Sequence, residues 1–215
     1  TPELVSEVPA SVAIIGRDEL MEEMKASPEL QKMLVLRVPG FGAATGSTSN
    51  PSLTLRGRKA LVMIDGVPQS TPLRNGSLGV RSVDASALER IEVVKGATSM
   101  YGNGAAGGLI NYITKLPASD AEISGDIGVS SRFSMVDSDD SFSQRIDGTL
   151  TGTVGDFSYV VNAVYDARGQ QKDADGDTMG LIYGLSDLTT KNLFSKFAYQ
   201  IDADKNLQLT YNLYD

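Results

Sequence analysis

Residues 88–115 read LERIEVVKGATSMYGNGAAGGLINYITK, and this stretch decides how the first half of the chain folds. Gly102, Gly104 and Gly107 have the spacing G-x-G-x-x-G and follow an apolar run. In a dinucleotide-binding loop this spacing opens a helix, whose N-terminal N–H groups hold the pyrophosphate. Here the residues that follow, 109–114, are β-branched and aromatic, which predicts a strand. We therefore expect a tight strand–loop–strand turn whose glycines allow close backbone packing, with no nucleotide bound.

The composition indicates a globular chain and removes several classes of function. Of its 215 residues, 41% are hydrophobic and 21% are charged. The net charge of −8 argues against a nucleic-acid-binding surface, which needs clustered Lys and Arg. Cysteine and histidine are both absent from the sequence, so disulfides, thiolate chemistry and the commonest general base are excluded. We expect no catalytic residues, no metal site and no intrinsic cofactor.

The sequence leaves β-strands as the one way in which this chain could insert into a membrane. No segment approaches the roughly 18 apolar residues that a membrane helix needs. The start of the sequence, Thr1 to Glu3, lacks the basic and apolar regions of a signal peptide. A β-barrel, however, crosses a membrane with strands of about ten residues. Membrane insertion by strands therefore stays open.

Residues 1–116 mix helix and strand signals and contain two long polar loops. The loops are Gly40–Ser52 and Gln69–Gly79, and loops of this length in a compact domain usually carry function. Ser27 is expected to cap a helix that begins at Pro28, and Asp84 to cap a single helical turn. The other predicted elements are strands at 12–15, 53–58, 60–68 and 90–94 and a helix at 17–25.

After Pro117 the pattern changes to period two, with one apolar and one small-polar face in each of five predicted strands. The turns at Gly155–Asp156 and Asp202–Asn206 are short, whereas the loops 132–141 and 169–190 are long and polar. Short turns at one end and long loops at the other are typical of outer-membrane barrels. A soluble α+β protein with a β-sheet that binds a partner is the alternative, because a soluble sheet also alternates.

Several motifs together resemble the TonB-dependent outer-membrane receptors. They are VPASVAII, the VPG before a Gly/Ser/Thr loop, LRGR, MIDGVP and the whole of residues 88–115. Ala97 departs from the family, which often has proline there. The resemblance implies an α+β plug domain over 1–116, with a small mixed sheet and short helices. It implies antiparallel transmembrane β-barrel strands over 117–215, about five in number and only part of a closed barrel.

The resemblance also implies a function. Such a protein is a receptor and energy-gated transporter for a ferric siderophore or a similar iron chelate, and its plug occludes the barrel. Its partners are the chelate, outer-membrane lipid, and TonB with the inner-membrane energy complex, and they include no nucleic acid. It lies in the bacterial outer membrane, with the plug facing the periplasm and the barrel lumen. The segment that engages TonB would precede VPASV, where only seven residues stand here, so a partial chain is expected. Corrinoid, haem and sugar receptors of the same family remain alternatives.

The resemblance places candidate site residues on two surfaces. Ligand contacts at the plug apex are expected from Gln69 and Arg74, and also from Thr45, Ser47 and Ser49. A cationic Arg74 suits an anionic chelate, although it could equally be a solvated loop arginine. The expected plug–barrel contacts are Arg56, Arg90, Glu89 and Glu92.

Two further points about charged residues stay as expectations. Arg56 and Arg90 would pair with barrel carboxylates beyond residue 215, so within this chain they should be exposed or paired locally with Glu89, Glu92 or Asp84. The segment KDADGDT, residues 172–178, invites a calcium-loop interpretation, but Gly176 stands too early for an EF-hand. We expect a solvated outer loop there.

Overall fold

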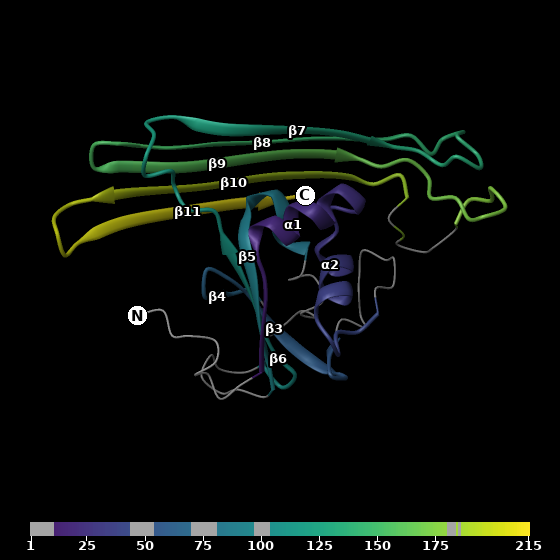
Figure 1. The fold of residues 1–215 in the computed structure, drawn as a ribbon, viewed down its shortest axis with the longest axis horizontal. Helices are drawn as coiled ribbons and strands as arrows, with labels where there is room; N and C mark the ends of the chain where they lie inside the picture. The colour runs from purple at the N-terminus through teal and green to yellow at the C-terminus, as the bar shows by residue number, and fades with distance from the viewer. Residues whose placement is uncertain (1–10, 44–53, 70–80, 97–103, 180–183, 185) are drawn as a thin grey trace. The chain divides into compact units, whose positions relative to one another are not determined.

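The computed structural model describes residues 11–43, 54–69, 81–96, 104–179, 184 and 186–215. These residues fall into two compact units, one that ends at Thr114 and one that runs from Lys115 to Asp215 (Figure 1). In the described part of the chain, no helix is both long and apolar enough to span a membrane.

The first unit is built on a mixed sheet, as predicted. Its strands are β1 (Ser11–Ile15), β2 (Thr54–Leu55), β3 (Arg58–Ile64), β4 (Val67–Pro68), β5 (Leu88–Lys95) and β6 (Gly108–Thr114). The strand order is β1-β5-β6-β3-β2, with β4 beside β3. Only β3 and β6 pair in parallel, whereas the other pairs are antiparallel. The apolar cluster at the centre of the sheet comprises Leu61, Met63, Ala105 and Leu109.

The described residues of this unit also include two short helices, α1 (Arg17–Ala26) and α2 (Leu30–Arg37), and the helical turn η3 (Ala85–Ala87). The prediction that Ser27 caps the second helix is wrong. The backbone of Ser27 is extended and its N–H donates to the carbonyl of Glu23, so Ser27 ends α1 instead. The predicted cap at Asp84 is confirmed, because its carboxylate accepts a hydrogen bond from the N–H of Ser86 at 2.8 Å.

The glycine-rich loop leads into a strand, which confirms the prediction made for residues 109–114. β6 begins at Gly108, whose φ of +132° suits only glycine. A Cβ atom on Gly107 would lie 2.6 Å from the carbonyl oxygens of both Leu55 and Arg58. These glycines therefore serve the close approach of neighbouring strands, and the helix that a phosphate loop requires does not follow them.

The second unit is a single antiparallel sheet of five strands in chain order, as the period-two pattern predicted (Figure 1). The strands are β7 (Ser124–Arg132), β8 (Ser143–Val154), β9 (Phe157–Ala167), β10 (Thr189–Gln200) and β11 (Asn206–Tyr214). Each pairs with the next along the chain in antiparallel register. β8 and β9 are joined by a tight turn at Gly155, which has a φ of +58°.

Candidate functional site

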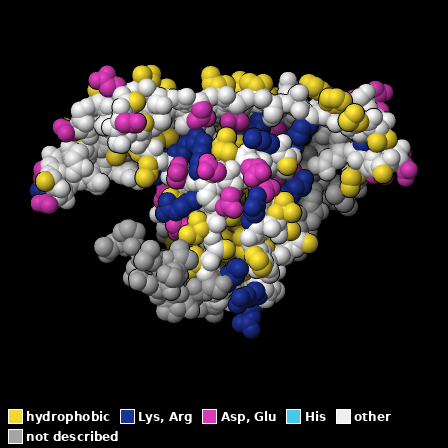
Figure 2. Space-filling model, in the orientation of Figure 1, with side chains coloured by type: hydrophobic (Ala, Val, Ile, Leu, Met, Phe, Trp, Pro, Cys, Tyr) yellow, Lys and Arg dark blue, Asp and Glu magenta, His cyan; other side chains and the backbone are white. Residues whose placement is uncertain are grey.

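One face of the five-stranded sheet is apolar and exposed. Ile127 on β7 is 81% exposed, and register places Val129 of β7 opposite Ile146 of β8. Hydrophobic side chains recur along this sheet in Figure 2. The exposed set also includes Leu150, Val154, Phe157, Tyr165, Leu193, Tyr199, Leu207, Leu209, Tyr211 and Leu213. A continuous apolar surface of this kind is not suited to water, so a hydrophobic environment or partner is expected to cover it.

Aromatic side chains gather on this sheet near the short turns. Phe157 stacks on Tyr159 and on Phe197, with a ring-centroid distance of 6.2 Å in both pairs. Tyr199 lies directly opposite Phe157 in the β9–β10 register. Aromatic groups at the edge of an apolar band are typical of strands that meet a membrane–water interface.

The other face of the same sheet carries buried charges arranged in pairs. On β8, Nε of Arg145 lies 3.0 Å from the carboxylate of Asp147, and the Arg145 side chain is 6% exposed. Asp166 of β9 is opposite Arg145 in register, and it accepts hydrogen bonds from Arg168 at 2.9 and 3.0 Å. A buried charge without a partner is costly, and in each of these pairs the carboxylate compensates the charge of the arginine.

Neutral polar groups continue this face, and buried apolar side chains lie among them, including Val160 and Val164 of β9. The amide of Asn162 donates to the Thr149 hydroxyl at 3.1 Å and to the carbonyl of Gly148 at 3.2 Å. Phe194 of β10 lies on the same face, opposite Asn162 in register, and it is fully buried. This face thus combines hydrogen-bonding and charged groups with a few buried apolar side chains.

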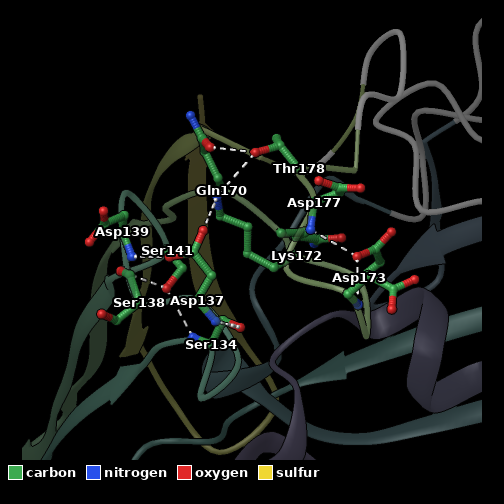
Figure 3. Close-up of polar contacts among 12 residues, drawn as sticks. Ser134, Asp137, Ser138, Asp139, Ser141, Gln170, Lys172, Asp173, Asp177 and Thr178 are labelled. Carbon is green, nitrogen blue, oxygen red and sulfur yellow. Dashed lines mark hydrogen bonds and ion pairs between the residues drawn. The ribbon is translucent and has the colours of Figure 1, made fainter.

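The two long loops at one end of the sheet are fastened together (Figure 3). Nζ of Lys172, from the second loop, lies 3.0 Å from the Asp137 carboxylate of the first loop and 3.2 Å from the Thr178 hydroxyl. Thr178 in turn donates to the side-chain oxygen of Gln170 at 2.8 Å. A hydrogen bond from the N–H of Asp139 and the Lys172 ammonium hold the pKa of Asp137 below its ordinary value.

The acidic segment 173–177 in the second loop makes a local turn. The Asp173 carboxylate accepts backbone N–H bonds from Asp175 at 3.0 Å and from Asp177 at 2.9 Å (Figure 3). Asp173, Asp175 and Asp177 are all exposed. Within the described ranges, no group of three acidic side chains is placed to hold a metal ion.

Four of the five predicted ligand residues, namely Thr45, Ser47, Ser49 and Arg74, lie outside the described residues. Gln69 is described, and it is half-buried just after β4. Its N–H donates to the carbonyl of Val62 at 2.8 Å, and its side-chain amide donates to the carbonyl of Val67 at 2.9 Å. Hydrogen bonds of Gln69 thus position the residue at which the predicted loop 69–79 starts.

The predicted plug–barrel residues divide between a turn and a strand. Arg56 was expected within a strand, but it lies in the turn between β2 and β3, with a φ of +53°, and it is exposed. The strand is interrupted because Arg56 and Gly57 both adopt left-handed backbone conformations. On β5, Nε of Arg90 lies 2.7 Å from the Glu92 carboxylate, which is a local pair, and Glu89 is half-buried beside them.

Sequence reasoning missed several polar residues that the structure brings together. The strand pattern predicted a polar face without a charge pair on it, although the i, i+2 spacing of Arg145 and Asp147 puts both side chains on one face. Lys115 and Lys172 were missed altogether, because their partners stand 11 to 35 residues away along the chain. For Lys115, the alternating threonines of a nearby predicted strand could have suggested the contact. For Lys172, whose partners lie in loops, the sequence carries no such signal.

Comparison with known proteins gives consistent results for both units. The family model described as TonB-dependent Receptor Plug Domain matches residues 5–109. The ferric aerobactin receptor of Klebsiella pneumoniae is 30% identical over 213 residues, which are 98% of this chain and 28% of that protein. The rhizobactin receptor of Rhizobium meliloti (strain 1021) is 30% identical over 224 residues, which are 98% of this chain and 29% of that protein.

One solved structure has a fold similar to that of this chain. The crystal structure of the siderophore receptor PirA from Acinetobacter baumannii superposes with a TM-score of 0.73 at 24% identity. The superposition covers 97% of this chain and 32% of the PirA chain, and at this identity it shows similarity of fold alone. The chain thus spans less than a third of the length of these relatives.

Proposed function

Because this chain belongs to the TonB-dependent receptor family, we propose that it is part of an outer-membrane receptor that imports a ferric siderophore. Residues 1–116 are its plug domain and residues 117–215 are the first strands of its barrel. The plug occludes the barrel and faces the periplasm and the lumen. TonB and the inner-membrane energy complex supply the work of transport, and the receptor itself makes and breaks no covalent bond.

The observation that carries this proposal is the exposed apolar face on strands of membrane-spanning length. The five strands contain 9, 12, 11, 12 and 9 residues. A tilted strand needs about 9–11 residues to cross a bilayer. The opposite face carries Arg145, Asp166 and Asn162, as the lumen side of a barrel requires. Lipid on one face and a polar lumen on the other account for both surfaces.

The ligand class is proposed from the relatives. The ferric aerobactin and rhizobactin receptors match 98% of this chain, so an iron chelate of a comparable kind is the proposed ligand. Gln69 and Arg74, with Thr45, Ser47 and Ser49, are proposed to contact it from the plug apex. Charge-assisted hydrogen bonds from Arg74 would suit an anionic chelate.

Two charged groups are proposed to help hold the plug in the complete receptor. Arg56 is exposed in the β2–β3 turn and is available for a carboxylate beyond this chain. Arg90, with its neighbours Glu89 and Glu92, forms the second contact. There Arg90 would bind a barrel carboxylate in addition to Glu92, which lies 2.7 Å from it in this chain, or in place of Glu92.

Binding to the full-length receptor tests the ligand assignment. Purified receptor in detergent would be titrated with ferric aerobactin, ferric citrate, haem and a corrinoid, with iron-free aerobactin as the control. We expect saturable binding of a ferric chelate and none of haem or the corrinoid. Binding of haem or the corrinoid alone would keep the family and overturn the siderophore assignment.

Partitioning separates the receptor from the alternative of a soluble interaction protein. After cell fractionation, the full-length protein is expected in outer membranes and in the detergent phase. Recovery in the aqueous phase alone would overturn the transporter proposal. In that case the exposed apolar sheet face would have to be covered by a protein partner.

A further inference from the structure

The first residues of the second unit, 115–122, are attached to its sheet by side chains of β8. They form no regular strand before β7 begins at Ser124. The N–H of Ala118 donates to the Thr151 hydroxyl at 2.9 Å, and the carbonyl of Ala118 accepts from the Thr153 hydroxyl at 2.7 Å. One residue of the segment therefore has both its backbone polar groups bound by threonines two positions apart.

A buried lysine strengthens the same attachment. Nζ of Lys115 donates to the Thr149 hydroxyl at 2.6 Å and lies 3.3 Å from the Asp126 carboxylate of β7. Lys115 is only 8% exposed, and a buried ammonium group is stable only where such partners hold it. Thr149, Thr151 and Thr153 alternate along β8, so all three hydroxyls lie on one face of the strand.

The end of the segment is held by the strands as well. The N–H of Thr153 donates to the carbonyl of Ala121 at 2.9 Å. The hydroxyl of Tyr159, on β9, donates to the carbonyl of Glu122 at 3.0 Å. Gly152 makes room for this contact, because a Cβ atom there would overlap the Glu122 carbonyl and lie 2.9 Å from the Tyr159 hydroxyl. A glycine, a tyrosine and three threonines thus fit this one segment.

We infer that residues 115–122 form an anchor that stays fixed on β8 while the plug is remodelled. This inference rests on the proposed function, in which TonB pulls on the plug. A pull transmitted along β6 reaches the barrel through Lys115. The anchor resists this pull with several hydrogen bonds and with the ion pair between buried Lys115 and exposed Asp126. The chain reaches these contacts before it reaches the first ladder hydrogen bond of β7. Remodelling is then confined to residues before the anchor, and the barrel edge at β7 stays intact.

Hydrogen exchange of the full-length receptor tests the anchor without requiring transport. Amides of residues 115–122 should stay protected at urea concentrations where β5 and β6 of the plug exchange freely. Replacing Thr151 and Thr153 together by valine should speed exchange of the Ala118 amide by about tenfold or more. Tyr159→Phe, which removes one hydroxyl, should loosen residue 122, whereas Thr189→Val on an exposed position of β10 should change nothing. An Ala118 amide that exchanges together with the plug, or equally fast in parent and double variant, would overturn the anchor.

Uptake by cells tests the consequence for transport. Ferric aerobactin labelled with radioactive iron would be used with the parent, the Thr151→Val/Thr153→Val variant and the Thr189→Val control. We expect unchanged binding affinity and slower uptake only in the double variant. Uptake at the parent rate, despite faster exchange at Ala118, would refute a role of the anchor in transport. A parent that neither binds nor imports the chelate would instead refute the proposed function, and the exchange experiment would still decide whether the anchor exists.

Discussion

Replacing Gly108 by alanine tests whether the glycine-rich loop serves strand packing. The residue has a φ of +132°, and holding alanine in so sparsely populated a conformation costs about 1–3 kcal/mol. The new Cβ atom would also overlap the carbonyl of Val94, and overpacking of this kind costs about 1–3 kcal/mol. That carbonyl belongs to the β5–β6 pair, so it cannot move away without disturbing the sheet. Together the two effects predict a loss of about 2–6 kcal/mol in the stability of the first unit.

Hydrogen exchange of β5 and β6 peptides in the full-length receptor measures this loss. Exchange should become faster by about thirtyfold or more, because protection reports the free energy of local opening. Gly148→Ala is the matched control: its Cβ atom would meet the nearest atom at an ordinary 3.6 Å, so little change is expected. Parent-like protection in Gly108→Ala would refute the packing argument. Saturable binding of NAD or ATP to the parent that is lost in this variant would also refute it, because the loop would then be a nucleotide site.

The remaining predictions concern charged side chains. Lys172→Met should raise the pKa of Asp137 only part of the way to its ordinary value, because the larger backbone hydrogen bond remains. Because the pKa of Asp137 is lowered, its contacts stabilise the two loops at pH values above the ordinary carboxyl pKa, and this stabilisation is lost as the pH falls through the lowered pKa. As the pH is lowered, hydrogen exchange of residues 133–142 should therefore speed up at a higher pH in the variant than in the parent. An unchanged pH profile would exclude the contact. Arg74→Ala should weaken binding of an anionic ferric chelate by about 1.5–3 kcal/mol in calorimetry, whereas unchanged affinity for every chelate would remove Arg74 from the site. The double variant Arg56→Ala/Arg90→Ala should release the plug at lower urea, measured as pore conductance, with ligand affinity nearly intact; a plug as tight as the parent's would show that these arginines do not hold it.

The sequence predicted the second unit better than the details of the first. Strand alternation places Ile146 and Leu150 on one face and Arg145 and Thr149 on the other, and the structure confirms this because a pleated strand has no other option. Phe194 was missed because it interrupts that alternation on β10, where it places a buried aromatic side chain on the otherwise mostly polar face.

Single residues in the first unit were harder to assign, because a capping residue between two helices can either end the first or begin the second. Ser27 has the composition of an N-cap, but α1 extends to Ala26 and uses it as a C-cap. Arg56 was expected in a strand because its neighbours are apolar, yet the left-handed pair Arg56–Gly57 makes a turn there. Contacts such as Lys115–Asp126 and Lys172–Asp137 join residues that only the completed sheet brings together.

Energy-dependent uptake is the measurement that tests the central claim most directly. The full-length receptor would be expressed in a strain that lacks other receptors for ferric aerobactin, with and without functional TonB. We predict that radioactive iron from ferric aerobactin accumulates only when both the receptor and TonB are present, while binding to the cell surface persists without TonB. Accumulation that does not depend on TonB, or a receptor that neither binds nor imports any ferric chelate, would contradict the account.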